Sequence, residues 1–351
     1  MKEDFLHYIW KNQLFNKADL RTVNGERISI IDVGNHNTNA GPDFLNAKIK
    51  IENLTWVGNV EIHVNSSDWI RHKHQNDKAY NNVILHLVYN DDKVIDTERG
   101  DIPQTLELSN RLDIDILTKY KKIFNQKESV LCTAYLSSID DKLWKETLQK
   151  LVVERFRNKV NEVEESLSKT TNDLEWVLFS FLAQSLGLKV NKQSMQMLAQ
   201  SISIKILRKY QKNEFQLFYS KIKYAISYKK IKELLNVELD EYWNTHYVFN
   251  KSSINKKKQL GDSTLDVIII NAIVPLYYLI GEKEEKYNAY ATTLLGSVKA
   301  EQNAIVKKYR NAGKEIKSAS DSQALIQLYN FYCSPKKCLT CSIGKQLMKN
   351  D

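Results

Sequence analysis

Two acidic residues, Asp43 and Glu61, are candidates for a catalytic or metal-binding role because of their side chains and their spacing. Asp43 follows Gly41-Pro42 at the end of a turn-rich segment, and Glu61 lies in the alternating stretch from Val60 to Val64. Two carboxylates that leave positions open for water and phosphate suit hard divalent ions such as Mg²⁺ or Mn²⁺. The pair therefore predicts a divalent-cation site capable of phosphodiester hydrolysis.

Histidines crowd around this pair in the sequence. Six of the seven lie within the first 86 residues: His7, His36, His63, His72, His74 and His86. His63 shares a strand face with Glu61, because alternate residues of a strand point the same way. We expect Asp43 and Glu61 as metal ligands, with His63 as a base or charge stabiliser. Further ligands or supporting residues are expected among Glu3, Lys48, His74, Asp77 and His86.

The same histidines allow a second interpretation with a softer ion. A Zn²⁺ or Fe²⁺ site with one position left for a hydrolytic water could draw on imidazoles and a carboxylate. Its candidate ligands are His63, His72, His74, Asp77 and His86. The alternative for the His72-x-His74 segment is a solvated loop, which fits His72 better than His74.

Three of the four cysteines lie near the end of the printed chain, at Cys333, Cys338 and Cys341. This spacing lets three thiolates converge on one ion. Three ligands are one short of a closed zinc site or of a four-thiolate iron–sulfur cluster, so we expect Cys132 as the fourth ligand, with His246 as the fallback. The alternative is a helix-terminal turn that carries thiols and no metal.

The elements that must position these residues fall into two groups. Helical spacing predicts a helix over residues 4–15, and strands are predicted over 27–33, 43–51, 56–64, 83–89, 93–96 and 104–108. Beyond residue 110 the pattern is helical nearly throughout, with a long amphipathic helix over 140–167. We expect an α+β protein: a mixed-sheet domain over residues 1–130, followed by an all-α domain over 131–351.

Composition narrows the class of protein further. A hydrophobic content of 42% in 351 residues supports buried cores rather than disorder. The start has no apolar signal segment, and the apolar run from Val267 to Ile280 contains Asn271 and Pro275 and is short for a bilayer-spanning helix. Few cysteines suit a reducing compartment. We therefore expect a cytoplasmic protein without a membrane partner.

Charge is distributed unevenly along the chain. Residues 1–130 carry 17 Lys and Arg against 19 Asp and Glu, whereas residues 131–351 carry 34 against 23. A basic second half predicts a polyanionic partner, with nucleic acid first, although a lysine-rich surface is also an ordinary soluble one. The pattern gives no indication of oligomeric state.

The acidic hairpin resembles a known family. Pro42-Asp43, a strand, a turn and Glu61-x-His63 are similar to the metal-binding hairpin of the PD-(D/E)XK nuclease superfamily, whose core is α-β-β-β-α-β. The resemblance implies a restriction-endonuclease-like domain in which Asp43 and Glu61 bind the metal, joined by the Ile62 carbonyl. The family lysine falls on His63, a departure from the pattern. Lys48 is the other candidate cation, although strict alternation places it opposite Asp43.

Two further resemblances concern the rest of the chain. Some RecB-related members of that superfamily hold an iron–sulfur cluster with one distant and three C-terminal cysteines, which the cysteine arrangement resembles in outline. The whole chain also resembles an uncharacterised bacterial family catalogued only as a domain of unknown function. The matching stretches are Glu3–His7, Gly41–Phe44, Gly58–His63, Ser67–Trp69 and Cys338–Gly344.

The expected function is a metal-dependent nuclease acting on DNA or RNA. One alternative is a non-catalytic nucleic-acid-binding or scaffold protein that keeps a nuclease-like sheet. Another is a zinc- or iron-dependent hydrolase of a small substrate.

Overall fold

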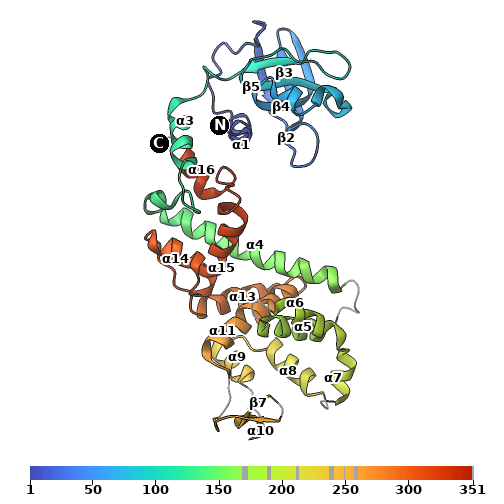
Figure 1. Ribbon diagram of the computed structural model, residues 1–351, viewed down its shortest axis with the longest axis vertical. Helices are drawn as coiled ribbons and strands as arrows, with labels where there is room; N and C mark the ends of the chain where they lie inside the picture. Colours follow the sequence, from blue (N-terminus) through green and yellow to red (C-terminus); the bar gives the residue numbers. More distant parts are fainter. Residues whose placement is uncertain are drawn as a thin grey trace. The chain divides into compact units, whose positions relative to one another are not determined.

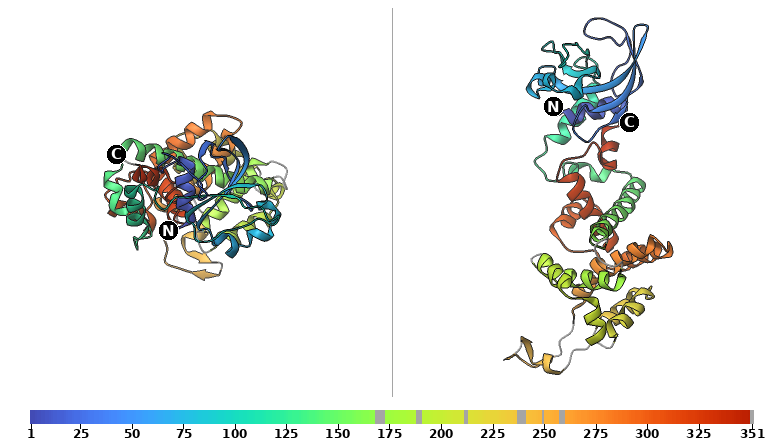
Figure 2. Two further views of the ribbon diagram at one scale, coloured as in Figure 1. Left: turned by 90° about the horizontal axis from the view of Figure 1, so that it is seen from above. Right: turned by 90° about the vertical axis from the view of Figure 1, so that its right-hand side faces the viewer.

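The computed structural model describes residues 1–167, 173–187, 191–210, 213–236, 241–248, 250–256 and 260–349. The chain divides into two compact units. The first contains residues 1–132 and the residues from 337 onward, and the second contains residues 133–336. The first unit combines a mixed sheet with helices and the second is mostly helical (Figures 1 and 2). The chain is therefore α+β, as the sequence predicts.

The sheet of the first unit has its main strands side by side in sequence order. The strands are β1 (Ile28–Asp32), β3 (Phe44–Ile51), β4 (Leu54–Asn65), β5 (Val83–Asn90) and β6 (Gln104–Glu107), with the short β2 (Asn35–His36) paired to β3. Strands β1, β3 and β4 are antiparallel neighbours, whereas β4, β5 and β6 run parallel. The predicted hairpin over residues 43–51 and 56–64 is confirmed as β3 and β4.

Strand β5 lies between two parallel partners, which explains its nearly continuous apolar sequence. Leu85, Leu87 and Val88 are fully buried there, as expected of a strand covered on both faces. Parallel neighbours need a crossover connection. Here it contains α2 (Asp68–Arg71) and the short helices η1 (His74–Asn76) and η2 (Lys78–Tyr80).

The predicted strand over residues 93–96 is wrong, because these residues form no regular element. Ile95 is instead buried in a small cluster with Trp69, Tyr80 and Val83. The Trp69 indole N–H also donates to the carbonyl of Asp96 at 2.9 Å. Side-chain packing beneath Trp69, rather than pairing with a neighbouring strand, fixes this segment.

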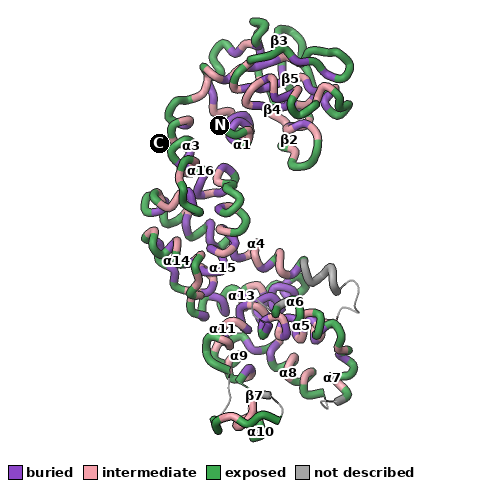
Figure 3. The backbone as a smooth tube through the Cα atoms, in the orientation of Figure 1, coloured by how far each residue is buried: buried purple, intermediate pink, exposed green. Residues whose placement is uncertain are grey.

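Helix α1 (Glu3–Asn12) packs against β4, and its apolar face is buried (Figure 3). Its apolar face includes Phe5, which stacks on Tyr120 of helix α3 (Ile114–Phe124) with ring centroids 4.1 Å apart. Glu3 and His7 lie one turn apart and therefore on one face of the helix. Both are half-buried, so the packing of α1 places two polar side chains against the sheet.

A β-bulge at the start of β3 changes which residues share a face. Phe44 pairs with Val60 and Ala47 with Gly58, so β3 has one residue more than β4 over this interval. Asn46 takes the left-handed conformation that the irregularity requires, with φ 58°. As a result Phe44, Ala47 and Ile49 are all buried. The strict alternation used to place Lys48 opposite Asp43 was therefore wrong.

The second unit is built from helices, with one small hairpin of strands. Its elements are η3 (Thr133–Ser138), α4 (Asp141–Leu167), α5 (Leu174–Leu186), α6 (Lys192–Ser201), α7 (Ile204–Tyr210), α8 (Glu214–Lys223), α9 (Tyr228–Leu235), α10 (Glu241–Asn244), β7 (His246–Val248), β8 (Lys251–Ser252), α11 (Asp262–Ile268), η4 (Ile269–Ile273), α12 (Val274–Gly281), α13 (Lys286–Ser297), α14 (Ala304–Asn311), α15 (Ala319–Leu328) and η5 (Tyr329–Cys333).

The most apolar segment of the second unit is a core helix. Residues 262–281 are long and apolar enough to cross a bilayer by length and composition alone, but most of this segment is buried within the protein. The segment packs against α4, α5 and α13. Other helices of this unit therefore cover its apolar surface.

Residues from 337 onward belong to the first unit, whereas the helical pattern of the sequence predicts them as part of the second domain. Helix α16 (Ser342–Met348) packs against α3. The Lys119 ammonium also donates to the carbonyl of Lys349 at 3.0 Å. The end of the described chain thus helps to cover the domain that contains the sheet.

We expect Gly344→Ala to loosen this packing. A Cβ at Gly344 would lie far inside contact distance of the Cys338 backbone carbonyl, which has little room to move. Overpacking of this kind costs about 1–3 kcal/mol. The matched control is Gly296→Ala in α13, where a Cβ meets nothing within 4 Å, so the helical preference for alanine should leave stability unchanged or slightly higher. Thermal unfolding of both variants tests this, and equal melting temperatures would contradict it.

Candidate metal and catalytic site

The two predicted carboxylates meet where β3 begins alongside β4. The Asp43 backbone N–H donates to Glu61 Oε2 at 3.2 Å, and the Ile62 backbone N–H donates to Asp43 Oδ2 at 2.9 Å. The carboxylate of each acid thus accepts a backbone N–H from the segment that carries the other acid. Among the described residues, Asp43 Oδ1 has no protein partner. The pair is therefore rigidly placed and keeps one oxygen available.

His7 of α1 places an imidazole beside Asp43. Its Nε2 lies 3.2 Å from Asp43 Oδ2. Burial lowers the pKa of His7, but the hydrogen bond and the attraction to Asp43 outweigh this, so the net pKa is raised. Glu3, one turn earlier, has a pKa raised by burial and by repulsion from Asp43, although His72 opposes the shift. Helix α1 thus contributes an acid and a base to the edge of the site.

Glu61 is a buried acid that lies close to imidazoles. It is only 5% exposed, and its Oε1 lies 3.2 Å from His74 Nε2 and 3.5 Å from His63 Nε2. Burial and the nearby Asp43 carboxylate raise the pKa of Glu61 to about 9. Within the part of the chain that the structure describes, no Lys or Arg forms an ion pair with Asp43 or Glu61. A cation at this position would relieve the repulsion between the acids.

The histidines behind Glu61 form a chain of contacts. His63 Nδ1 lies 2.8 Å from His86 Nε2, and His63 Nε2 lies 3.1 Å from His72 Nδ1. Burial and the neighbouring imidazoles lower the pKa of His63 to about 2 and that of His86 to about 3. Both rings are therefore neutral at neutral pH, the form in which imidazole binds metals.

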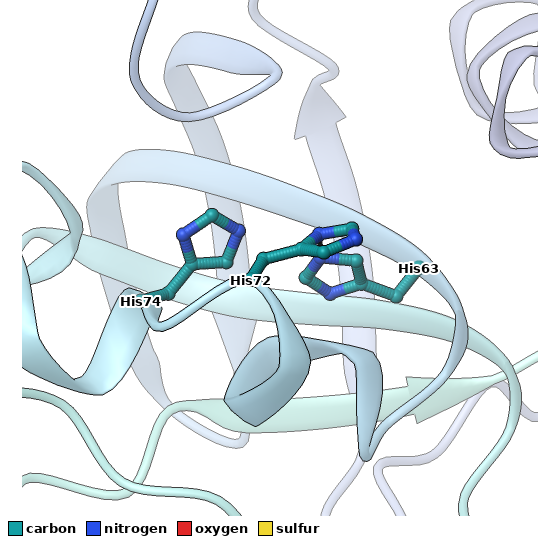
Figure 4. Close-up of side chains that lie close together, drawn as sticks. All are labelled: His63, His72 and His74. Carbon is teal, nitrogen blue, oxygen red and sulfur yellow. Dashed lines mark hydrogen bonds between the residues drawn. The ribbon is translucent and has the colours of Figure 1, made fainter.

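Three of these imidazoles converge. The donor atoms of His63, His72 and His74 all lie within 4.8 Å of one another, and across the described ranges this is the one group of its kind. Figure 4 shows the three rings close together. His74 stacks on Tyr80 with ring centroids 3.8 Å apart, which fixes the orientation of its ring.

The fold brings together most of the predicted site residues and separates two of them. Asp43, Glu61 and His63 are in contact, His74 and His86 touch this set, and Glu3 lies beside it. The register places the exposed Lys48 opposite Val57, four positions before Glu61 along β4. Asp77 is exposed and caps η2 by accepting from the Ala79 N–H. These two residues lie outside the cluster.

The sequence did not indicate His7 as a site residue, and it offered His72 only as a ligand of the alternative zinc or iron site. A signal for His7 was present, since Glu3 and His7 are spaced by four residues on an amphipathic helix and must share a face. His72 is exposed, in agreement with the solvated-loop interpretation, yet its ring reaches His63. Its side chain turns inward because α2 ends at Arg71 and Lys73 takes a left-handed conformation, with φ 65°. The local sequence pattern does not predict that turn.

The cysteine site stays a prediction. Cys333 belongs to the second unit, whereas Cys132, Cys338 and Cys341 belong to the first. Cys333 Sγ lies 3.2 Å from the Tyr309 hydroxyl. Burial raises the pKa of the Cys341 thiol, so a metal ion or another positive charge is needed to favour its thiolate form.

The comparison with known families agrees with the whole-chain resemblance. The chain matches the model described as "Protein of unknown function (DUF2851)" over residues 3–218 and 216–304, and it belongs to that family. No curated protein and no solved structure matches the chain. Function must therefore be argued from the site.

Proposed function

We propose that the protein is a divalent-metal-dependent phosphodiesterase that acts on nucleic acid. The observation that carries this proposal is the close pair of the half-buried Asp43 and the buried Glu61, whose described contacts include no Lys or Arg ion pair. Two adjacent carboxylates are costly where burial removes water and no lysine or arginine neutralises them. A divalent ion offsets that cost and is the usual partner of such a pair in phosphoryl chemistry.

The residues present fit such an ion. Asp43 Oδ1 and the Glu61 carboxylate supply hard oxygen donors, and Glu3 Oε1 is buried without a hydrogen-bond partner. A bound Mg²⁺ or Mn²⁺ would polarise a phosphoryl oxygen and lower the pKa of a bound water. The chain's own contribution is to hold the carboxylates through backbone N–H groups.

The two imidazoles nearest the acids suit different roles. His7 lies beside Asp43 and has a raised pKa, so it suits the stabilisation of negative charge on a phosphate. His63 is neutral and buried with a pKa lowered to about 2, so it suits the binding of a metal better than the acceptance of a proton or the stabilisation of negative charge.

Two further features support this class of reaction. The order α1, β1, β3, β4, α2, β5 follows the α-β-β-β-α-β order of the nuclease core that the sequence resembles, with β2 inserted. The basic composition of residues 131–351 suits a polyanionic substrate. The departure at His63 leaves the family lysine without a counterpart among the described contacts of the acids, and His7 is the candidate replacement.

Cleavage of DNA and RNA in the presence of Mg²⁺ or Mn²⁺ tests the proposal. Loss of an outer partner of a metal ligand costs up to about 100-fold in activity. Because Asp43 is proposed as a ligand itself, we expect Asp43→Asn to reduce cleavage by more than about 100-fold. Asparagine still accepts the Ile62 N–H, so the fold should be kept. The matched control is Asp77→Asn, which conserves the cap of η2 and should cleave like the wild type. Salt-dependent nucleic-acid binding without cleavage under any metal condition would instead identify a binding protein.

A further inference from the structure

The histidine group beside the acids has the donor chemistry of a different metal ion. Imidazole nitrogens suit Zn²⁺ and related first-row ions, whereas Mg²⁺ prefers oxygen. We propose that His63, His72 and His74, with Glu61 as the carboxylate ligand, form a site for a transition-metal ion of the Zn²⁺ type. Glu61 also belongs to the proposed phosphodiesterase site. A catalytic role of the transition-metal ion rests on that proposed function, whereas binding of the ion does not.

Three of the spacings between the donors are close to those of a tetrahedral centre. Ligand atoms at the usual Zn²⁺ distances lie roughly 3.3 Å from one another. His63 Nε2 lies 3.1 Å from His72 Nδ1 and 3.5 Å from Glu61 Oε1, and His74 Nε2 lies 3.2 Å from the same oxygen. Three of the contacts that a four-ligand site requires are therefore already close to the bound spacing.

The protein also fixes the orientation of the buried ring. For His63 Nε2 to offer a lone pair to a metal, the proton of the ring must lie on Nδ1. His86 Nε2, 2.8 Å away, can accept that proton in a hydrogen bond. An outer partner of this kind orients a histidine ligand and selects its tautomer. His86 is fully buried and packs against Trp69, so we assign it as a positioning residue.

His74 provides an independent observation in favour of a ligand. Its Nε2 is buried, has no hydrogen-bond partner and lies on the side of Glu61, while Tyr80 and Trp69 hold the ring from two directions. A buried nitrogen without a partner costs about 1–3 kcal/mol. Hydrogen bonds of His63 with His86 and His72 would satisfy both nitrogens of the His63 ring without metal, but they leave His74 Nε2 unsatisfied.

The two oxygens of Glu61 face different neighbours. Oε1 lies beside the imidazoles, and Oε2 accepts the N–H of Asp43. The transition-metal ion would therefore take Oε1 and leave the Asp43 side of the carboxylate to the proposed phosphodiesterase site. His72 is exposed, so an ion can reach the group without opening of the sheet.

Metal binding by the full chain, without nucleic acid, tests this inference. Protein freed of metal with EDTA is titrated with Co²⁺ and followed by absorbance, and with Zn²⁺ by calorimetry. Co²⁺ bound by nitrogen and oxygen shows visible bands without the strong near-ultraviolet band of thiolate ligation, which separates this site from the cysteines. We expect His72→Ala to weaken binding at this site by at least about 100-fold, whereas His36→Ala, at an exposed histidine of the same unit, leaves it unchanged.

His72 is exposed, so its replacement should not endanger the fold, and circular dichroism checks this. His74→Ala should give the same loss of affinity. Equal Co²⁺ affinity in the wild type and both variants, or a spectrum with thiolate ligation alone, would overturn the inference. If Co²⁺ binds as expected but no nucleic acid is cleaved, the phosphodiesterase proposal fails and the metal site stands.

Discussion

Glu61→Gln should abolish both metal-dependent cleavage and Zn²⁺ binding at the histidines while making the metal-free protein more stable at neutral pH. The pKa of Glu61 is raised to about 9 by burial and by Asp43, above its unfolded value near 4.5. Stability from this group is thus fully present below pH 4.5 and is lost as the pH rises through the folded value. Glutamine mimics the protonated acid and can still accept the N–H of Asp43. At pH 7, about 2.5 pH units above the unfolded pKa, the gain is on the order of 3 kcal/mol.

The pH dependence separates this effect from a simple change in packing. In EDTA, the difference in free energy of unfolding between variant and wild type should grow from pH 5 to pH 8. Addition of Zn²⁺ should reverse the order of stability, because only the wild type binds the ion. Denaturant titrations at several pH values measure both effects. A constant difference across this pH range would show that Glu61 is not held in a charge-repelling environment.

The second large effect concerns the buried imidazoles. The pKa of His63 is lowered to about 2 and that of His86 to about 3, first by burial. A histidine with a depressed folded pKa stabilises the folded state above its unfolded value near 6.5. That stability is lost as the pH falls below 6.5, because the unfolded chain then binds more protons. Each ring should cost about 2 kcal/mol between pH 7 and pH 5.

Replacement of both rings by phenylalanine should remove this acid sensitivity. The double variant His63→Phe/His86→Phe removes both sides of the contact between the two buried rings and conserves aromatic volume. In EDTA it should lose less free energy of unfolding than the wild type between pH 7 and pH 5, and it should lose Zn²⁺ binding. His246→Ala, in the second unit, should keep the wild-type acid sensitivity. Identical acid unfolding of the double variant and the wild type would contradict the prediction.

Local sequence patterns predict the class of fold and the contact between Glu61 and His63. Period-two alternation over residues 56–64 placed Glu61 and His63 on one face, and their contact in the structure follows from that pleat. The apolar run over residues 83–89 likewise indicated a strand with two partners. Such features depend on residues close together in the chain, so local patterns are sufficient to reveal them.

The other contacts around Asp43 and Glu61 depend on tertiary packing. The bulge between Phe44 and Ala47 is not marked by glycine, and it changed the predicted face of Lys48. The docking of α1 brings His7 to Asp43, and the turn after α2 carries His72 to His63. These contacts join segments 9 to 36 positions apart through packing, which alternation and helical spacing do not encode. Local patterns thus predicted a site around Asp43 and Glu61, whereas the contacts of His7 with Asp43 and of His72 with His63 arise only in the folded chain.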